Sequence, residues 1–172
     1  MRASALVLLC GASIGLGGEA FAGVKVSEKI RNYDIAGKNG AALLDAMDRR
    51  GPKHGFLTRA IAQTRYSVSW TIEWGETRSA CRVKRVDGDL AITYTYPRVA
   101  EKLPPDMAGR WDKFISGVTK HEKTHGDLAR QMARAVERSV AKLSVRNDPG
   151  CRKSRDEVKR RMAAIYADYE AR

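Results

Sequence analysis

The sequence predicts an α+β fold, in which a small antiparallel sheet packs against a long helix and a C-terminal helix runs back antiparallel to it. Two patterns carry this prediction. Apolar and polar residues alternate between residues 66 and 96, which is the period of strands with one buried face. Apolar residues then recur at spacings of three and four from about residue 107 to residue 143, which is the period of an amphipathic helix. The turn-forming residues Asp148-Pro149-Gly150 separate it from a second helix over residues 152–169.

The first residues of the chain are typical of a secretory signal peptide. A basic start precedes a short apolar run, and Ala20-Phe21-Ala22 forms a small-x-small cleavage pattern. The apolar run is too short to cross a bilayer. Lipidation at Cys10 is the alternative, but Leu9 stands where a small residue is expected. We therefore expect removal of residues 1–22 on export, which leaves residues 23–172 as a single periplasmic or secreted domain.

The net charge of the chain indicates which kinds of partner it can attract. The formal net charge of +12 suits anionic partners such as the cell envelope, acidic substrates or nucleic acid. The sequence has no nucleic-acid-binding motif and no basic segment interleaved with aromatic residues, and export argues against DNA. We expect a peptide or envelope substrate, no nucleic-acid partner and no stable insertion into a membrane after signal cleavage.

Two elements are expected ahead of the sheet pattern. Residues 24–36 alternate and predict a first strand. Residues 39–49 predict a short amphipathic helix that Asn39 caps and Gly51-Pro52 ends. The inner face of this helix is expected to consist of Leu43, Leu44 and Met47.

A meander of three or four antiparallel strands is expected next. Residues 66–74 place aromatic and β-branched side chains on one face and polar side chains on the other. Residues 81–85 and 90–96 continue the pattern, and Asp87-Gly88 between them predicts a tight hairpin. Leu103-Pro104-Pro105 then marks the boundary with the helical half of the chain.

The long helix carries the pattern His121-Glu122-Lys123-Thr124-His125. Residues four apart on a helix share one face and lie about 6 Å apart, so the two imidazoles can bind one metal ion. Glu122 follows the first histidine, and its carboxylate can reach a water activated by that metal. Both histidines continue the apolar stripe of the helix. A second interpretation is therefore two core histidines that neighbouring residues satisfy by hydrogen bonds.

The segments around this pattern resemble a family of secreted bacterial proteins. The resemblance rests on Trp111, on HEKTHGD at residues 121–127 and on Asp148-Pro149-Gly150-Cys151. It extends to residues 33–52 and 60–96. The family is catalogued as a domain of unknown function and is regarded as a group of zinc-dependent peptidases. The resemblance implies a zincin-like fold and Zn²⁺-dependent peptidase activity.

The pattern and the resemblance together predict an exported zinc metallopeptidase that hydrolyses peptide or amide bonds. His121 and His125 would hold Zn²⁺ with a third ligand. Glu122 is the expected general base, which takes the proton of the zinc-activated water and passes it to the leaving amine. The alternative is an exported non-catalytic zinc-binding protein, or one that interacts with the cell envelope. A catalytic zinc keeps one open position, whereas a structural zinc is closed by four protein ligands.

The pattern supplies two ligands, and the sequence offers three candidates for the third. If the last two helices form an antiparallel hairpin that turns near Pro149, residues equally distant from the turn face each other. Glu170 then lies within one helical turn of His125 and is the expected ligand. Asp168 is the second candidate, and His54, in the loop before the meander, is the third.

Signal cleavage removes one of the three cysteines and leaves Cys81 and Cys151. Two cysteines in an exported protein most often form one disulfide. We expect a bond between them that ties the sheet to the turn between the last two helices. Ligation of zinc by these thiols is the alternative, although neither cysteine belongs to a C-x-x-C pair.

Overall fold

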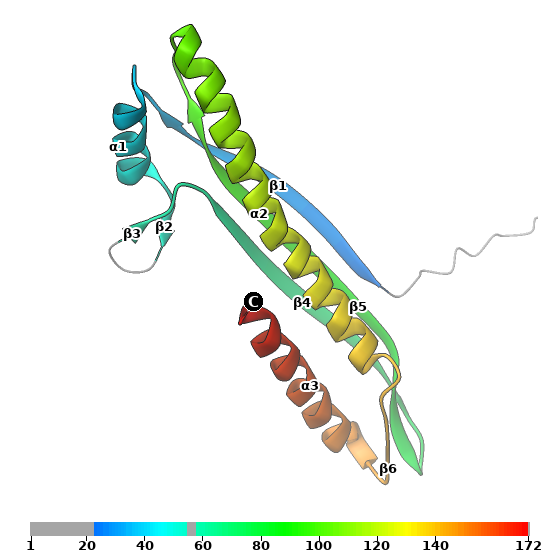
Figure 1. Ribbon diagram of the computed structural model, residues 1–172. Coiled ribbons are helices and arrows are strands. Elements are labelled where there is room, and N and C mark those ends of the chain that lie inside the picture. Colours follow the sequence, from blue (N-terminus) through cyan, green and yellow to red (C-terminus); the bar gives the residue numbers. More distant parts are fainter. Residues whose placement is uncertain (1–22, 55–57, 172) are drawn as a thin grey trace, which may run out of the picture.

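The fold is α+β, as the sequence predicts. The computed structural model describes residues 23–54 and 58–171, so the predicted signal peptide, residues 1–22, lies outside the described residues. A long helix lies along one face of a sheet, and a second helix returns beside it (Figure 1). The elements in chain order are β1 (Val24–Ile35), α1 (Gly40–Arg50), β2 (Lys53–His54), β3 (Thr58–Arg59), β4 (Gln63–Glu76), β5 (Ala80–Val99), α2 (Pro105–Val140), β6 (Ser144–Arg146), the 3-10 turn η1 (Pro149–Cys151) and α3 (Arg152–Glu170).

The main sheet is mixed, which corrects the expectation of an antiparallel sheet. Its strand order is β1-β5-β4, and β6 pairs with the start of β5. β4 and β6 run antiparallel to β5, but β1 runs parallel to it. The reason is the position of β5, which inserts between β1 and β4. A simple meander would instead have kept β4 beside β1 and left β5 at the edge.

β5 is one continuous strand where two were expected. The hairpin predicted at Asp87-Gly88 is wrong, because both residues lie inside the β4–β5 ladder, with Gly88 opposite Trp70. Gly88 leaves space for the indole ring, since a Cβ at this position would lie 2.7 Å from Trp70 Cζ3. The chain reverses earlier, where the Thr77 hydroxyl accepts a hydrogen bond from the backbone N–H of Ala80 at 3.0 Å.

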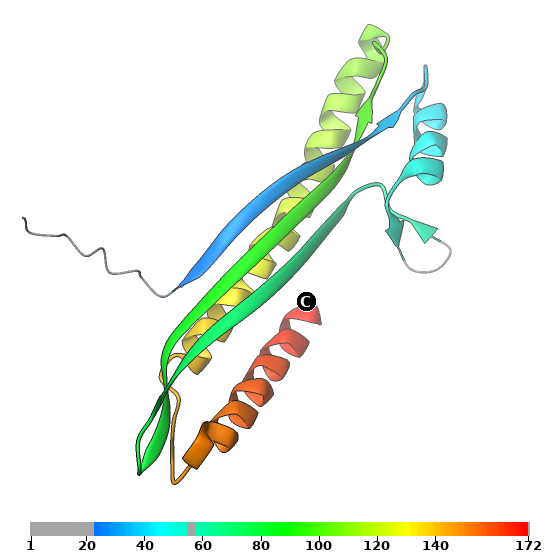
Figure 2. The same ribbon diagram turned by 180° about the vertical axis from the view of Figure 1, so that it is seen from behind.

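One face of the sheet is buried and the other is open. Figure 2 shows the open face, with α2 behind the strands. The side chains of β4 on this face are polar and exposed, which confirms the period-two pattern; they include Arg65, Ser67, Ser69, Thr71 and Glu73. On the buried face, Leu90, Ile92, Tyr94 and Tyr96 of β5 pack against Ala129 and Ala133 of α2. Because a one-residue slip would exchange the two faces, this burial fixes the strand register.

α2 is 36 residues long, which corresponds to about 54 Å at the rise of an α-helix. It begins at Pro105, which is favourable in a first turn because proline lacks the N–H that would have no partner there. Its buried residues recur at spacings of three and four; they are Glu122, Gly126, Ala129, Met132, Ala133, Val136 and Val140. The predicted helix, residues 107–143, therefore agrees with the observed one to within a turn.

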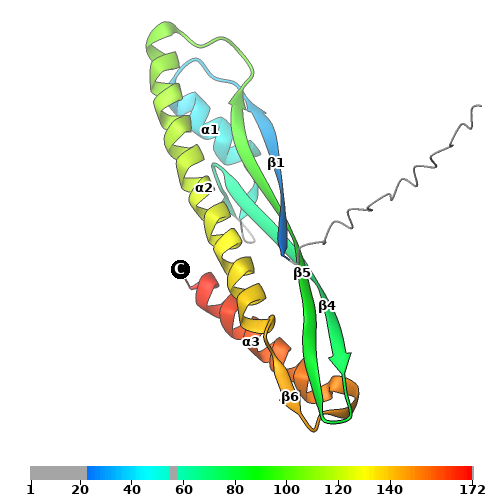
Figure 3. The same cartoon turned by 90° about the vertical axis from the view of Figure 1, so that its right-hand side faces the viewer.

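α3 runs back antiparallel to α2, as predicted (Figure 3). An apolar cluster joins the two helices to the sheet; it consists of Val83, Val86, Val140, Leu143 and Val158. Trp70 Nε1 donates a hydrogen bond to the Tyr166 hydroxyl at 2.7 Å, which fixes α3 to β4 near the end of the chain. In the described ranges, no helix combines the length and the apolar character that crossing a membrane requires.

A disulfide joins Cys81, at the start of β5, to Cys151, just before α3. This confirms the predicted pair, and both residues are buried. Since each thiol is used in this bond, the alternative in which they bind zinc is wrong. The bond holds the α2–α3 connection against the sheet.

α1 is the short helix that the sequence predicts. The Asn39 side chain accepts a hydrogen bond from the backbone N–H of Ala42 at 2.9 Å, which confirms the cap. Leu43 and Met47 are buried, but Leu44 is 48 % exposed. Because successive helix residues are rotated by about 100°, Leu44 lies off the line of the other two, and its assignment to the inner face is wrong.

Candidate metal centre

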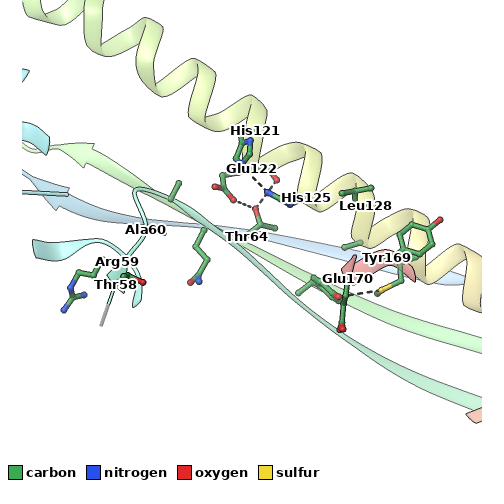
Figure 4. Close-up of a pocket in the computed structure, with 15 residues that line it drawn as sticks. Thr58, Arg59, Ala60, Thr64, His121, Glu122, His125, Leu128, Tyr169 and Glu170 are labelled. Carbon is green, nitrogen blue, oxygen red and sulfur yellow. Dashed lines mark hydrogen bonds between the residues drawn. The ribbon is translucent and has the colours of Figure 1, made fainter. Parts of the chain in front are cut away.

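The motif lies in the middle of α2, beside a cavity of about 610 Å³ that three parts of the chain enclose. Figure 4 shows Thr58, Arg59 and Ala60 at one end, the motif in the centre, and Leu128, Tyr169 and Glu170 at the other. The walls thus come from the β3–β4 segment, from α2 and from the end of α3. The lining also contains apolar and aromatic side chains of α2 and β4, which are Leu128, Ala129, Met132 and Tyr66.

His121 and His125 point toward one another on successive turns of α2. Their Nε2 atoms are 3.2 Å apart, and their ring planes lie at 85°. Two imidazole nitrogens that each lie 2.0–2.1 Å from a tetrahedral zinc ion are separated by about 3.3 Å. The pair therefore fits the donor spacing that one zinc ion requires.

Both histidines are exposed at the cavity and lie outside the apolar core. The expectation that they continue the buried stripe is wrong, and so is the alternative of two core histidines. The buried line of this turn consists of Glu122 and Gly126, each one residue after a histidine. A rotation of about 100° per residue places the histidines at the edge of the helix–sheet contact, where solvent and a ligand can reach them.

Glu122 is 7 % exposed and accepts hydrogen bonds from the sheet. The Thr64 hydroxyl of β4 lies 2.6 Å from Glu122 Oε2 and 3.0 Å from the Glu122 backbone oxygen. Thr64 is not among the site residues that the sequence predicts. The alternation of β4 could have placed it on the buried face, but no sequence signal links it to a residue 58 positions later.

Gly126 and Tyr94 bring the helix close to the sheet at the motif. A Cβ at Gly126 would lie 2.0 Å from the Tyr94 hydroxyl, so only glycine fits. Tyr94 is 3 % exposed, and its hydroxyl has no hydrogen-bond partner among the described residues. Burial, and then the charge of Asp127, raise the pKa of this phenol. Burial and the nearby Glu122 carboxylate raise the pKa of the neighbouring Tyr96 to about 12.

The structure brings Glu170 to the cavity but does not join it to the histidines. Glu170 and Leu128 line the same cavity, which agrees with the hairpin geometry from which Glu170 was predicted. Among the side chains that the structure describes, however, no group of three or more His, Cys, Asp or Glu is close enough to hold a metal ion. Asp168 is not among the cavity-lining residues. His54 lies in β2, and its side chain is outside those described.

Glu170 also influences the pKa of Tyr66, another residue that lines the cavity. Burial is the largest influence that raises the pKa of Tyr66, and the charge of Glu170 adds to it. The Tyr66 hydroxyl in turn donates a weak hydrogen bond to Met132 Sδ at 3.7 Å. At the opposite end, the Arg59 guanidinium donates to the Gly51 carbonyl at 2.7 Å. The cavity thus has a cation at one end and a carboxylate at the other.

Together, the fold and the site define an α+β protein in which one helix presents a histidine pair and a buried glutamate to a single cavity. The model of DUF922, a family of bacterial proteins of unknown function, matches residues 30–172, and the chain belongs to this family. No curated protein and no solved structure gives a significant match. The comparisons therefore establish the family and leave the activity to be inferred from the site.

Proposed function

We propose that the protein is an exported zinc-dependent metallopeptidase of the HExxH type. The observation that carries the proposal is the 3.2 Å separation of His121 Nε2 and His125 Nε2 in the wall of a cavity. A buried glutamate on the same helical turn lines that cavity. These are the donor set and the base that metal-assisted hydrolysis of a peptide or amide bond requires.

Each residue of the motif has a defined task in this proposal. His121 and His125 would hold the metal through Nε2, which requires both nitrogens to be unprotonated. Bound zinc supplies Lewis acidity, which lowers the pKa of a coordinated water and polarises a carbonyl oxygen. Glu122 accepts a proton from the attacking water and delivers it to the leaving amine. Its near-complete burial keeps this carboxylate beside the cavity and away from bulk solvent.

Substitution of Glu122 separates metal binding from hydrolysis. Glu122→Gln keeps the shape of the side chain but removes the base, so we expect unchanged zinc affinity and a loss of hydrolysis of about 10²- to 10⁴-fold. The measurements are zinc titration and cleavage of a peptide library by the mature chain. Loss of zinc together with activity would show that Glu122 acts as a ligand.

Glu170 remains our proposed third ligand, with Asp168 second and His54 third. Glu170 lines the same cavity as the histidines, and it lies at the end of α3. Glu170→Gln should therefore weaken zinc binding while Asp168→Asn should not. Equal zinc affinity in wild type and Glu170→Gln, combined with weakened zinc binding in His54→Ala, would identify His54 as the third ligand.

A second candidate function is a non-catalytic zinc-binding or envelope-interaction protein. The formal net charge of +12 supports the envelope-interaction form of this candidate, because a basic surface attracts the polyanionic cell envelope. Zinc-loaded wild-type protein that cleaves no member of a peptide or cross-bridge library, and whose metal has four protein ligands by X-ray absorption, would support this candidate.

The proposed location is the periplasm or the medium, and the proposed substrate is a peptide or an amide-linked envelope polymer. The Cys81–Cys151 disulfide supports an oxidising compartment. Cell fractionation, with the mass of the mature N-terminus, tests the location. Recovery of the chain in the cytoplasm with its first residues intact would contradict it.

A further inference from the structure

Thr64 connects the sheet to the motif helix through Glu122. We propose that Thr64 is a positioning residue, which holds one carboxylate oxygen of Glu122 so that the other is presented to the cavity. The observation is the pair of contacts from the Thr64 hydroxyl, 2.6 Å to Glu122 Oε2 and 3.0 Å to the Glu122 backbone oxygen. The inference rests on the proposed hydrolytic function, because it concerns how the base is held.

The Thr64 hydroxyl proton goes to the carboxylate. A threonine hydroxyl carries one proton, so it can make only one strong donor bond. Bonds from a hydroxyl to a carboxylate are about 2.5–2.7 Å long and stronger than bonds to a peptide oxygen. The contact to Glu122 Oε2 has this length, and the burial of Glu122 strengthens it further.

This bond gives the two oxygens of Glu122 different surroundings. Oε2 accepts the hydrogen bond from Thr64, whereas Oε1 accepts none from the described residues. The residue nevertheless lines the cavity that His121 and His125 also line. With Oε2 held, rotation of the carboxylate is restricted, so Oε1 keeps one direction in which to accept a proton.

The hydroxyl is itself held in place by the sheet. Thr64 pairs with Tyr94 in the β4–β5 ladder, and Tyr94 packs against the α2 backbone at Gly126. Threonine is β-branched, so few side-chain rotamers are open to it on a strand. The strand, the rotamer and the close helix contact together fix the position of the donor relative to Glu122.

A purely structural role for Thr64 is the competing explanation, because a buried carboxylate needs a donor whatever it does. The two roles predict different kinetics. Loss of a structural contact lowers stability but leaves the kcat of the folded protein unchanged. Loss of positioning lowers kcat of the folded, zinc-loaded protein while KM stays the same.

The experiment compares four variants of the mature, zinc-loaded chain on the peptide that the wild type cleaves best. Thr64→Val keeps the shape and removes the donor, and Thr64→Ala removes the donor with a smaller side chain, as a second variant should valine prevent folding. Thr64→Ser keeps the hydroxyl. Thr71→Val is the matched control, since Thr71 lies on the same strand and faces the open side of the sheet. The readouts are kcat, KM, zinc affinity and the circular dichroism spectrum.

We expect Thr64→Val and Thr64→Ala to lower kcat by about 100-fold, with unchanged KM and zinc affinity. Thr64→Ser should restore most of kcat, and Thr71→Val should change none of these values. Equal kcat in folded Thr64→Val and wild type would overturn the inference and leave the proposed function standing. Absence of cleavage by the zinc-loaded wild type would instead overturn the proposed function, and the inference with it.

Discussion

At the scale of single residues, the contact between Gly126 and Tyr94 sets how closely the motif helix approaches the sheet. The Tyr94 hydroxyl occupies the space of a missing Cβ at Gly126. A glycine inside a helix costs about 1 kcal/mol relative to alanine. This cost is offset by close helix–sheet contact, which brings Glu122 within reach of Thr64.

Two glycines of α2 provide a direct test of this contact. Gly126→Ala should lower the free energy of unfolding by about 1–3 kcal/mol, because the new methyl group overlaps the Tyr94 hydroxyl. Gly117→Ala, on the same helix with no atom within 4 Å of the new Cβ, should raise it by about 1 kcal/mol. Urea unfolding of the purified variants measures both values.

A double substitution tests whether the Tyr94 hydroxyl causes the expected loss of stability in Gly126→Ala. Tyr94→Phe removes the overlapping oxygen, so Gly126→Ala should cost less in a Tyr94→Phe background than in the wild type. An equal cost in both backgrounds would mean that the glycine acts through the backbone and not through this contact.

The sequence predicts the residues of the motif better than the residues around them. His121, Glu122 and His125 follow from one short pattern, because residues four apart on a helix are neighbours whatever the rest of the fold does. Thr64 and Tyr94 reach the same site only through strand pairing and helix–sheet packing. Such contacts depend on tertiary register, which a single sequence does not specify.

At the scale of elements, the start of α3 is stabilised by the buried Asp148. Its carboxylate accepts hydrogen bonds from the backbone N–H groups of Lys153 and Ser154 at 2.9 and 2.8 Å, and from the Ser154 hydroxyl at 2.7 Å. These bonds satisfy donors that a helix start leaves free. Burial raises the pKa of Asp148, but the bonds from Ser154 and Lys153 outweigh it and hold the pKa below its usual range.

This lowered pKa predicts how stability depends on pH. A carboxyl group with a lower pKa in the folded state stabilises the protein fully above its unfolded pKa, and this contribution disappears as the pH falls through the folded pKa. Asp148→Asn should therefore be less stable than the wild type at pH 7, and the difference should shrink below about pH 4. Urea midpoints across this range provide the measurement. Two curves that stay parallel down to acid pH would contradict the assignment.

The secondary structure shows where local patterns suffice and where they do not. α2 and α3 lie close to their predicted bounds, because apolar periodicity and the turn at Pro149-Gly150 are local signals. The hairpin expected at Asp87-Gly88 is absent because Trp70, on the neighbouring strand, uses the space that Gly88 provides. The parallel pairing of β1 likewise follows from the insertion of β5 between two earlier strands. No local sequence pattern predicts this insertion.

At the scale of the whole molecule, the site exists because three distant segments meet at one cavity. α2 provides the histidine pair and Glu122, β4 provides Thr64, and the end of α3 provides Glu170. The hairpin geometry predicts that Glu170 lies beside the cavity. It does not give the tilt of α3, which decides whether the Glu170 carboxylate approaches the histidine pair. The disulfide and the Trp70–Tyr166 hydrogen bond hold both ends of α3 to the sheet.

The most direct test of the central claim is the zinc content of the mature chain after dialysis against buffer of known metal concentration. The 3.2 Å spacing of the two Nε2 atoms predicts one zinc ion per chain. His121→Ala and His125→Ala should each abolish this binding while the circular dichroism spectrum stays that of the wild type. A folded wild-type chain that takes up no zinc on titration, or that binds it equally well without either histidine, would contradict the account.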